Sequence, residues 1–275
     1  MGRLYLVATP IGNLQDITLR ALDVLREVPL IAAEDTRSAR RLLDHFGIAA
    51  KLTSYNEHNM RAKTPLLLDA LAAGDVAVVS DAGMPGISDP GHELVLAAVE
   101  AGHTVVPLPG ASAVLAAVAA SGLPSRRFHY VGFLPRQSGP RRRALVEAAA
   151  CGDTLVVFES PHRVRATLED ALAALGDRRV AVCRELTKLY EEIWRGSIAD
   201  ALAHFVQPRG EFTLVIEGGA APSAVDAVPA DIPALVAALK ADGLTAKDGV
   251  AALMKRVKLS RRDAYAAWHD QDRRR

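Results

Sequence analysis

Residues 76–91 read VAVVSDAGMPGISDPG, and this stretch decides the fold class. Its first part, Val76–Val79, is short, apolar and rich in β-branched residues, which is typical of a strand buried on both faces of a parallel sheet. Three glycines and two prolines follow within the twelve residues from Ser80 to Gly91. They predict tight turns whose exposed amides and carbonyls reach a ligand at the carboxyl end of the strand. Asp81 is placed there to hydrogen-bond a ribose or an amino group, although a structured turn without a ligand explains the same residues.

Short apolar runs alternate with helical patterns on both sides of this stretch. Further strands are expected at residues 4–8, 30–33, 104–108, 130–133, 155–158, 180–183 and 212–217, with helices ending near 27 and spanning 38–46, 93–101 and 112–120. The alternation predicts an α/β fold in which helices cover a parallel sheet on both faces. We expect two α/β halves, residues 1–122 and 123–218.

The chain changes character after the last expected strand. Residues 219–231 are rich in Ala, Pro and Gly and are interpreted as a linker. Residues 232–275 carry three short helical patterns and predict a small helical domain of helix-turn-helix type. Thr245 and Ser260 are expected to cap helices, because a hydroxyl oxygen accepts a hydrogen bond from a free helix N–H. Tyr265 and Trp268 are expected to pack its core.

Composition places the chain among ordinary globular proteins, with 50% hydrophobic and 24% charged residues. The net charge of +1 hides two basic stretches, residues 126–146 and 255–275. A basic surface of this kind favours a polyanionic partner, although a solvated face explains it equally well. The two cysteines, Cys151 and Cys183, are expected to be buried and reduced.

Several kinds of chemistry are excluded by what the sequence lacks. The dipeptide Gly-Lys never occurs, which rules out a Walker A loop. The first expected strand is followed by Thr9-Pro10-Ile11-Gly12-Asn13 rather than by a dinucleotide fingerprint, so a cofactor without a pyrophosphate fits better. No metal is expected, because no ligands occur at metal-binding spacing. Without a signal peptide or a membrane-spanning run, the protein is expected to be cytoplasmic.

Seven motifs in chain order carry a resemblance to a known family. Three of them, LYLVATPIGNL at residues 4–14, the loop containing Asp81 and PGAS at 109–112, resemble the tetrapyrrole (corrin/porphyrin) methylase superfamily. Four more resemble one branch of it, which methylates a cytidine 2′-oxygen in the decoding region of small-subunit (16S) ribosomal RNA. They are AEDTR at 33–37, SYNEHN at 54–59, FESPHR at 158–163 and RELTK at 184–188. The resemblance covers residues 1–218 and extends to the helical tail.

The resemblance implies a two-domain tetrapyrrole-methylase-like fold in which S-adenosylmethionine lies in a cleft between the two α/β domains. It also implies a homodimer. The residues that it assigns to cofactor contact are Pro10, Asp81, Ala82, Gly83, Ser112, Ala113, Phe158, Glu159, Leu186 and Thr213. Most of these contacts would be made by the backbone, and Phe158 could equally be a core aromatic residue.

Methylation of a ribose hydroxyl benefits from a general base, which contributes about 10²–10⁴-fold. The candidates in the motifs are Glu34, Asp35, His162 and Glu185. Each has a simpler explanation or remains unassigned: Asp35 could form an ion pair with Arg37, His162 could cap a helix, and Glu185 could pair with Lys188 on the surface. The sequence does not choose among them.

Contact with 16S ribosomal RNA in the small ribosomal subunit is expected from polar and basic residues in the same motifs and in the first basic stretch. These are Arg37, Asn56, His58, Arg136, Arg141, Arg142, Arg143 and Lys188. Two other functions stay open at this point. A small-molecule methylase would act on a corrinoid or porphyrin, and a non-catalytic nucleic-acid-binding protein would depend on its helical tail alone.

Overall fold

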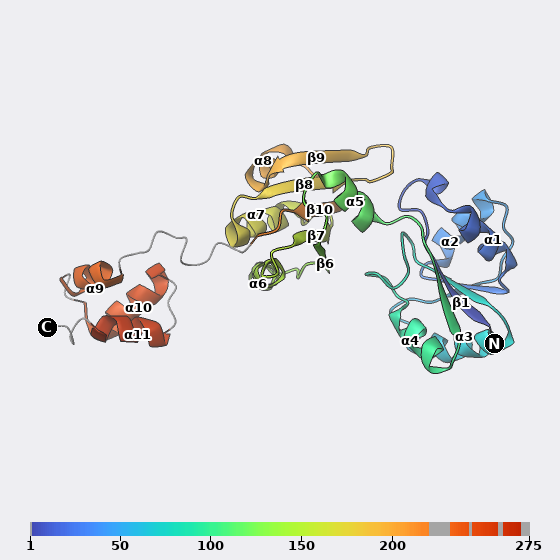
Figure 1. The fold of residues 1–275 in the computed structure, drawn as a ribbon, viewed down its shortest axis with the longest axis horizontal. Helices are drawn as coiled ribbons and strands as arrows, with labels where there is room; N and C mark the ends of the chain where they lie inside the picture. The colour runs from blue at the N-terminus through green and yellow to red at the C-terminus, as the bar shows by residue number, and fades with distance from the viewer. Residues whose placement is uncertain (1, 220–231, 242–243, 258–260, 271–275) are drawn as a thin grey trace. The chain divides into compact units, whose positions relative to one another are not determined.

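The computed structural model describes residues 2–219, 232–241, 244–257 and 261–270. The chain divides into two compact units, Met1–Gly219 and Ala220–Arg275. The first unit carries two five-stranded sheets with helices packed on them (Figure 1). The expected α/β architecture is therefore confirmed.

The first sheet is entirely parallel, in the order β3-β2-β4-β1-β5. Its strands are β1 (Arg3–Val7), β2 (Leu30–Ala33), β3 (Leu52–Ser54), β4 (Val76–Val79) and β5 (Thr104–Leu108). The helices that connect them are α1 (Leu19–Glu27), α2 (Thr36–His45), α3 (Met60–Ala73) and α4 (His92–Glu100), with a 3-10 turn η1 at Leu14–Asp16.

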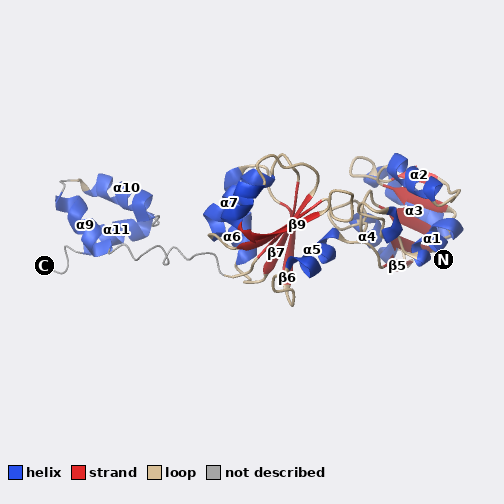
Figure 2. Ribbon diagram, turned by 90° about the horizontal axis from the view of Figure 1, so that it is seen from above, coloured by secondary structure: helices blue, strands red, loops and turns tan. Residues whose placement is uncertain are grey.

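Helices cover both faces of this sheet, as the apolar strands predicted. Successive side chains of a strand point to opposite faces. Tyr5 accordingly joins the core that contains residues of α1 and α2, and its neighbour Leu4 joins the core that contains residues of α3 and α4. Figure 1 shows α1 and α2 on one side of β1 and α3 and α4 on the other, and Figure 2 shows the same half from above with its strands in red. The carboxyl ends of the strands consequently open at one edge, where α/β sheets bind ligands.

The second sheet is mixed, in the order β6-β7-β10-β8-β9. Its strands are β6 (Phe128–Phe133), β7 (Thr154–Glu159), β8 (Arg179–Arg184), β9 (Glu192–Ser197) and β10 (Phe212–Ile216). Only β6 and β7 run parallel to each other; the remaining pairs are antiparallel. The helices of this half are α6 (Ser138–Ala149), α7 (Val164–Leu175) and α8 (Ile198–His204).

Helix α5 (Ala113–Ser121) follows the first sheet in the chain but packs on the second. Its Ala117 lies in a core with Ala181, Cys183 and Val215. Residues of small volume along α5 permit this close approach to the strands. The helix thus links the two halves of the first unit, and its first turn lies at the edge of the site described below.

The second unit contains three helices, α9 (Ile232–Ala241), α10 (Ala246–Val257) and α11 (Arg261–Asp270). They share their own apolar core, in which Trp268 is buried and lies directly over Gly249. Trp268 packs the core as expected, whereas Tyr265 is exposed. Thr245 caps α10 by accepting a hydrogen bond from the Asp248 amide at 3.3 Å. The expected cap Ser260 and the expected linker from residue 220 onward lie outside the described residues.

Candidate active site

A pocket of about 570 Å³ lies between the loops of the first sheet and one face of the second. Its volume falls within the range of about 300–1,000 Å³ that is common for small-molecule sites. The loop after β4 and the start of α5 form one side, and strands β6, β7, β10 and β8 form the other. Both halves of the first unit therefore contribute to a single site.

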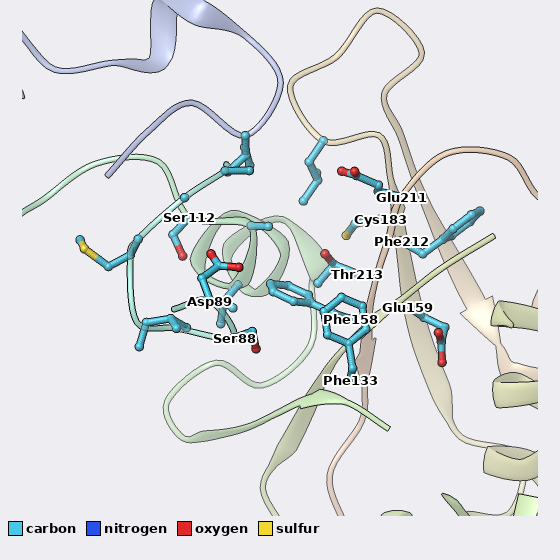
Figure 3. A pocket seen from close by; sticks show the side chains of 18 of the residues that line it. Ser88, Asp89, Ser112, Phe133, Phe158, Glu159, Cys183, Glu211, Phe212 and Thr213 are labelled. Atoms are coloured by element: carbon cyan, nitrogen blue, oxygen red, sulfur yellow. The ribbon is translucent and has the colours of Figure 1, made fainter. Parts of the chain in front are cut away.

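One row of side chains across the second sheet forms the floor of this pocket. Thr213 is in register with Phe158 on β7 and with Cys183 on β8, and Phe158 is in register with Phe133 on β6. Residues in register across neighbouring strands point to the same face of a sheet. Figure 3 shows Phe133, Phe158, Thr213 and Cys183 on one side of the pocket, facing Ser112 and Asp89 on the other.

A β-bulge places Tyr130 on the same face of the sheet as Phe133 and Phe158. Strand β6 gains one residue between Tyr130 and Gly132, where its register with β7 shifts. Because of the extra residue, Tyr130 and Phe133 both lie on the pocket face. Their rings meet Phe158 edge to face, with centroids 5.2 Å and 5.7 Å away. The result is an aromatic wall suited to a planar ring.

The opposite side is built from the glycine-rich loop after β4. Thr9 and Gly83 form two backbone hydrogen bonds, 2.9 Å and 3.0 Å long, which join this loop to the end of β1. Gly83 has a φ of +82°, a conformation that favours glycine. The Asp81 amide donates to Glu34 Oε2 at 3.2 Å, so the end of β2 also supports the loop. Hydrogen bonds to residues that follow β1 and β2 therefore hold the loop in place.

Three carboxyl groups on this side share an environment that disfavours their charged forms. Burial raises the pKa values of Glu34 and Asp81, and neighbouring carboxylates add to the rise. Burial, followed by the charge of Glu34, raises the pKa of Asp89 from 3.8 to about 6. Carboxyl groups with pKa values shifted in this way are typical of functional sites.

The residues expected to contact a cofactor lie on the pocket wall, with one exception. Those that line it are Asp81, Ala82, Gly83, Ser112, Ala113, Phe158, Glu159, Leu186 and Thr213. Pro10 is absent from the wall, and its neighbour Ile11 lines it instead. The carboxylate of Glu159 belongs to the opposite face of the sheet, where it accepts hydrogen bonds from Thr167 at 2.7 Å and from the Ser160 amide at 2.9 Å. Only the other atoms of Glu159 can face a ligand.

The four candidates for a general base are not brought together. Glu34 lines the pocket, but Asp35, His162 and Glu185 do not. Asp35 caps α2 and forms a 2.7 Å ion pair with Arg37, whose hydrogen bonds lower the pKa of Asp35 to about 2. A carboxylate with so low a pKa is a weak base. The simpler explanation of Asp35 as an ion-pair partner therefore fits the structure.

Glu185 is likewise held by its neighbours. Its Oε1 accepts from Lys188 Nζ at 2.9 Å and from the Glu211 amide at 2.8 Å. Burial alone would raise the pKa of Glu185, but these hydrogen bonds outweigh it and the pKa is lowered. Lys188 also forms an ion pair with Glu211, a residue of the pocket wall. Lys188 is thus connected to the pocket wall by its ion pair with Glu211.

The residues expected to bind RNA differ in how exposed their side chains are. Arg136, Arg143 and His58 are exposed, and the side chain of Arg37 is 83% exposed. Asn56 is half-buried and accepts a hydrogen bond from the His58 amide, which stabilises its own turn. The exposed guanidinium groups of Arg37, Arg136 and Arg143 remain accessible to a phosphate.

The expectation for Arg141 does not fit the structure. Its side chain is only 5% exposed and forms a 2.7 Å ion pair with Asp170 on α7. Arg142 reaches the same carboxylate at 2.5 Å from the surface. Because the guanidinium of Arg141 is enclosed and paired, it joins α6 to α7 and is not offered to a polyanion.

Several wall residues were missed by the sequence analysis. They are Ile11, Met84, Ile87, Ser88, Asp89, Val114, Leu115, Tyr130, Phe133, Ser160, Pro161, Cys183, Glu211 and Phe212. Ser88 and Asp89 belong to the quoted loop and could have been found there, since they follow its second turn. The other cysteine, Cys151, is exposed, which corrects the expectation that both thiols are buried.

Two other features, a metal site and a membrane-spanning helix, are absent from the described residues. In that part of the chain, no group of three or more His, Cys, Asp or Glu side chains is arranged to hold a metal ion. No helix among the same residues has the length and apolar character required to cross a bilayer. The pocket is therefore the candidate active site in the described part of the chain.

The fold and this pocket define a class of protein. Residues 3–202 match the family described as Tetrapyrrole (Corrin/Porphyrin) Methylases, and the chain belongs to that family. Similar solved structures include diphthine synthase, 16% identical with a TM-score of 0.63 over 78% of this chain and 90% of that one. Another is uroporphyrin-III C-methyl transferase from Thermus thermophilus complexed with S-adenyl homocysteine, 22% identical with a TM-score of 0.57 over 78% and 97%. At these identities the likeness shows the fold alone.

Relatives of higher sequence identity show to which group within this family the chain belongs. Ribosomal RNA small subunit methyltransferase I of Halalkalibacterium halodurans is 54% identical over 220 residues, which are 79% of this chain and 76% of the relative. The protein of the same name from a Synechocystis species is 47% identical over 277 residues, 96% of each chain. Within the family, the chain belongs to the ribosomal RNA small subunit methyltransferase I group.

Proposed function

We propose that this protein transfers a methyl group from S-adenosylmethionine to the ribose 2′-oxygen of a cytidine in the decoding region of 16S ribosomal RNA. Membership of the methyltransferase group supports S-adenosylmethionine-dependent methylation of ribosomal RNA. The observation that carries the proposal is the pocket, because one wall offers backbone groups and carboxyl groups and the other offers aromatic rings. An adenosine needs both kinds of surface.

The residues of the pocket fit the methyl donor in size and chemistry. Phe158 and Thr213 on the second sheet face the glycine-rich loop, where Asp81 and Ala82 are exposed. Ser112 and Ala113, at the N-terminus of α5, would contact the donor from the side. When bound, S-adenosylmethionine supplies an electrophilic methyl group. The task of the protein is to orient the acceptor oxygen toward it and to exclude water, an effect worth up to ~7–11 kcal/mol.

The RNA would approach with its phosphates near exposed cations such as Arg37, Arg136 and Arg143. We further propose that the protein acts in the cytoplasm on the small ribosomal subunit, and that it is a homodimer. Exposed apolar side chains on α3 and α4, including Leu66, Leu96 and Val99, support self-association. Light scattering should give twice the mass of the chain, and a monomer would remove this part of the proposal.

The experiment uses S-adenosylmethionine with a labelled methyl group and small subunits from cells that lack the enzyme. A 2′-O-methyl group protects the adjacent phosphodiester from alkali, because the free hydroxyl is needed for cleavage. We expect the label in an alkali-resistant dinucleotide whose 5′ nucleoside is the methylated cytidine. Label on a base, or transfer only to a tetrapyrrole, would overturn the proposal.

A further inference from the structure

Two carboxyl residues of the pocket wall, Asp89 and Glu211, were assigned no role by the sequence analysis. Asp89 lies in the second turn of the loop after β4 and lines the pocket. Figure 3 shows its side chain directed into the pocket on the same side as Ser112, with Phe158 and Thr213 opposite. The group is therefore placed on the side of the site that faces the aromatic floor.

The other carboxylates of the pocket wall have neighbours of their own. The Asp35 amide and the Ser38 hydroxyl lower the pKa of Asp81, against the larger effect of burial. Glu34 accepts from the Asp81 amide. The remaining two, Glu159 and Glu211, are bonded to Thr167 and Lys188.

Asp89 is set apart by its position. Within the described part of the chain no salt bridge reaches its carboxylate, and the hydroxyl of nearby Ser80 donates to the Gly83 carbonyl at 3.3 Å. The carboxylate of Asp89 therefore keeps acceptor capacity for an incoming hydroxyl group. Glu34 Oε1 keeps such capacity as well, but Glu34 holds the amide of Asp81, whereas Asp89 faces the aromatic floor.

We propose that Asp89 is the catalytic base, which accepts the proton of the ribose 2′-hydroxyl as the oxygen is methylated. This inference rests on the proposed function. In the step, the 2′-oxygen forms a bond to the methyl carbon, and the carbon–sulfur bond breaks with its electron pair remaining on sulfur. The hydroxyl proton passes to a carboxylate oxygen of Asp89 and is later released to water. Glu34 acts as a positioning residue, because it holds the amide of Asp81 in the same loop.

The charges around Asp89 suit this role. Burial and the carboxylates of Glu34 and Asp81 raise its pKa to about 6, while the Ser80 hydroxyl opposes the rise. From the second sheet, Tyr130 faces it, and the charge of Asp89 adds to the burial that raises the pKa of Tyr130. A base whose pKa lies near the working pH combines a large deprotonated fraction with a useful affinity for the proton.

The test compares Asp89→Asn and Asp89→Glu with wild type in the labelled-methyl assay across pH. For Asp89→Asn we expect kcat to fall by about 10²–10⁴-fold. The affinity for S-adenosylhomocysteine, measured by calorimetry, should stay within about threefold of wild type.

The wild-type rate should decline as the pH falls through about 6, because protonated Asp89 cannot accept a proton. Asp89→Glu should keep part of the activity, and its rate should also decline as the pH falls. Asp69→Asn, on the exposed face of α3, is the matched control and should behave as wild type.

A second measurement does not depend on turnover. In the free protein with ¹³C-labelled aspartate, one carboxyl resonance should titrate at about pH 6 and be missing in Asp89→Asn. Glu34→Gln should move that midpoint to lower pH, because it removes a negative charge beside Asp89.

The possible failures can be told apart. If wild type labels the ribose and Asp89→Asn does so within about threefold of its rate, the role of Asp89 is overturned while the proposed function stands. A parallel loss of S-adenosylhomocysteine binding and kcat would also overturn it, because the residue would then hold the donor. If wild type places no label on a ribose oxygen, both the proposed function and the base are overturned.

Discussion

The hydroxyl groups of Ser88 and Tyr130 lie 2.5 Å apart, and their hydrogen bond joins the loop after β4 to strand β6 of the other sheet. Ser88 has a φ of 61°, which residues other than glycine rarely adopt. Gly132 lies opposite, where an added Cβ would approach Ser88 Oγ to 3.3 Å. The loop is thus held against the second sheet at a point where both segments have a residue with a positive φ, Ser88 in the loop and Gly132 in the strand. This contact fixes the distance across the pocket.

Replacing Tyr130 with Phe should weaken the binding of the methyl donor without unfolding the protein. The lost hydrogen bond contributes about 0.5–1.5 kcal/mol, which corresponds to roughly 2–10-fold in affinity. Calorimetry with S-adenosylhomocysteine measures the change, and circular dichroism checks the fold. Tyr190→Phe, at an exposed position away from the pocket, is the control. Equal affinities in both variants would show that the contact does not organise the site.

Asp81→Ala should also reduce the affinity for the donor, because it removes a carboxylate from the wall of the pocket. A hydrogen bond to a charged group contributes about 1.5–3 kcal/mol, so we expect at least roughly tenfold weaker binding. Asp69→Ala provides a surface control. Unchanged calorimetric binding would remove Asp81 from the site.

The buried ion pair between Arg141 and Asp170 should matter for stability and not for RNA binding. Asp170→Asn leaves an enclosed guanidinium without its partner, which costs about 3–5 kcal/mol of the free energy of unfolding. Denaturant unfolding at neutral pH measures this. The control is Asp23→Asn, which breaks an exposed pair with Arg26 and should cost at most about 1 kcal/mol. Similar losses in the two variants would contradict the buried role.

The same pair has a pH signature. Burial alone would raise the pKa of Asp170, but hydrogen bonds from Arg142, Ser138 and Arg141 outweigh it and hold the pKa below the ordinary 3.8. The stabilisation is therefore complete above that value and is lost as the pH falls through the lowered folded-state pKa. In Asp170→Asn this part of the acid dependence should be absent from unfolding curves recorded between neutral and strongly acidic pH.

The two thiols should react at very different rates. Cys151 is exposed, whereas Cys183 is enclosed in the pocket floor and burial raises its pKa to about 11. Since the thiolate is the reactive form, alkylation of Cys151 at neutral pH should be faster by at least about 100-fold. Mass spectrometry after limited treatment with iodoacetamide resolves the two sites. Comparable labelling would mean that the floor of the pocket opens in solution.

Much of the fold could be predicted because its strands are apolar on both sides. Strands β1, β2, β4 and β5 were found from short runs of this kind. Strand β3 was missed since its three residues are only half-buried, and β9 since Glu192, Arg195 and Gly196 interrupt its pattern. Helix α3 contains Pro65, which usually ends a helix. The packing of α5 on the second sheet depends on contacts between distant segments, which local patterns do not contain.

The site was predictable where its loops carry glycine-rich motifs and unpredictable where it depends on strand register. The motif residues around Asp81 and Ser112 lie on the wall as expected. Tyr130 and Phe133 were not assigned, because regular alternation would place residues three apart on opposite faces. Arg141 was misassigned because a run of three arginines gives no sign that its first member points toward α7 and Asp170.

The extra residue in β6 lets two residues that are three positions apart in the sequence share one face of the sheet. Deleting Val131 would remove the bulge and leave Tyr130 and Phe133 two positions apart, so regular alternation would keep both rings on the pocket side. Among relatives, a one-residue gap at this point should therefore leave the aromatic wall, and the ligand that it suits, unchanged.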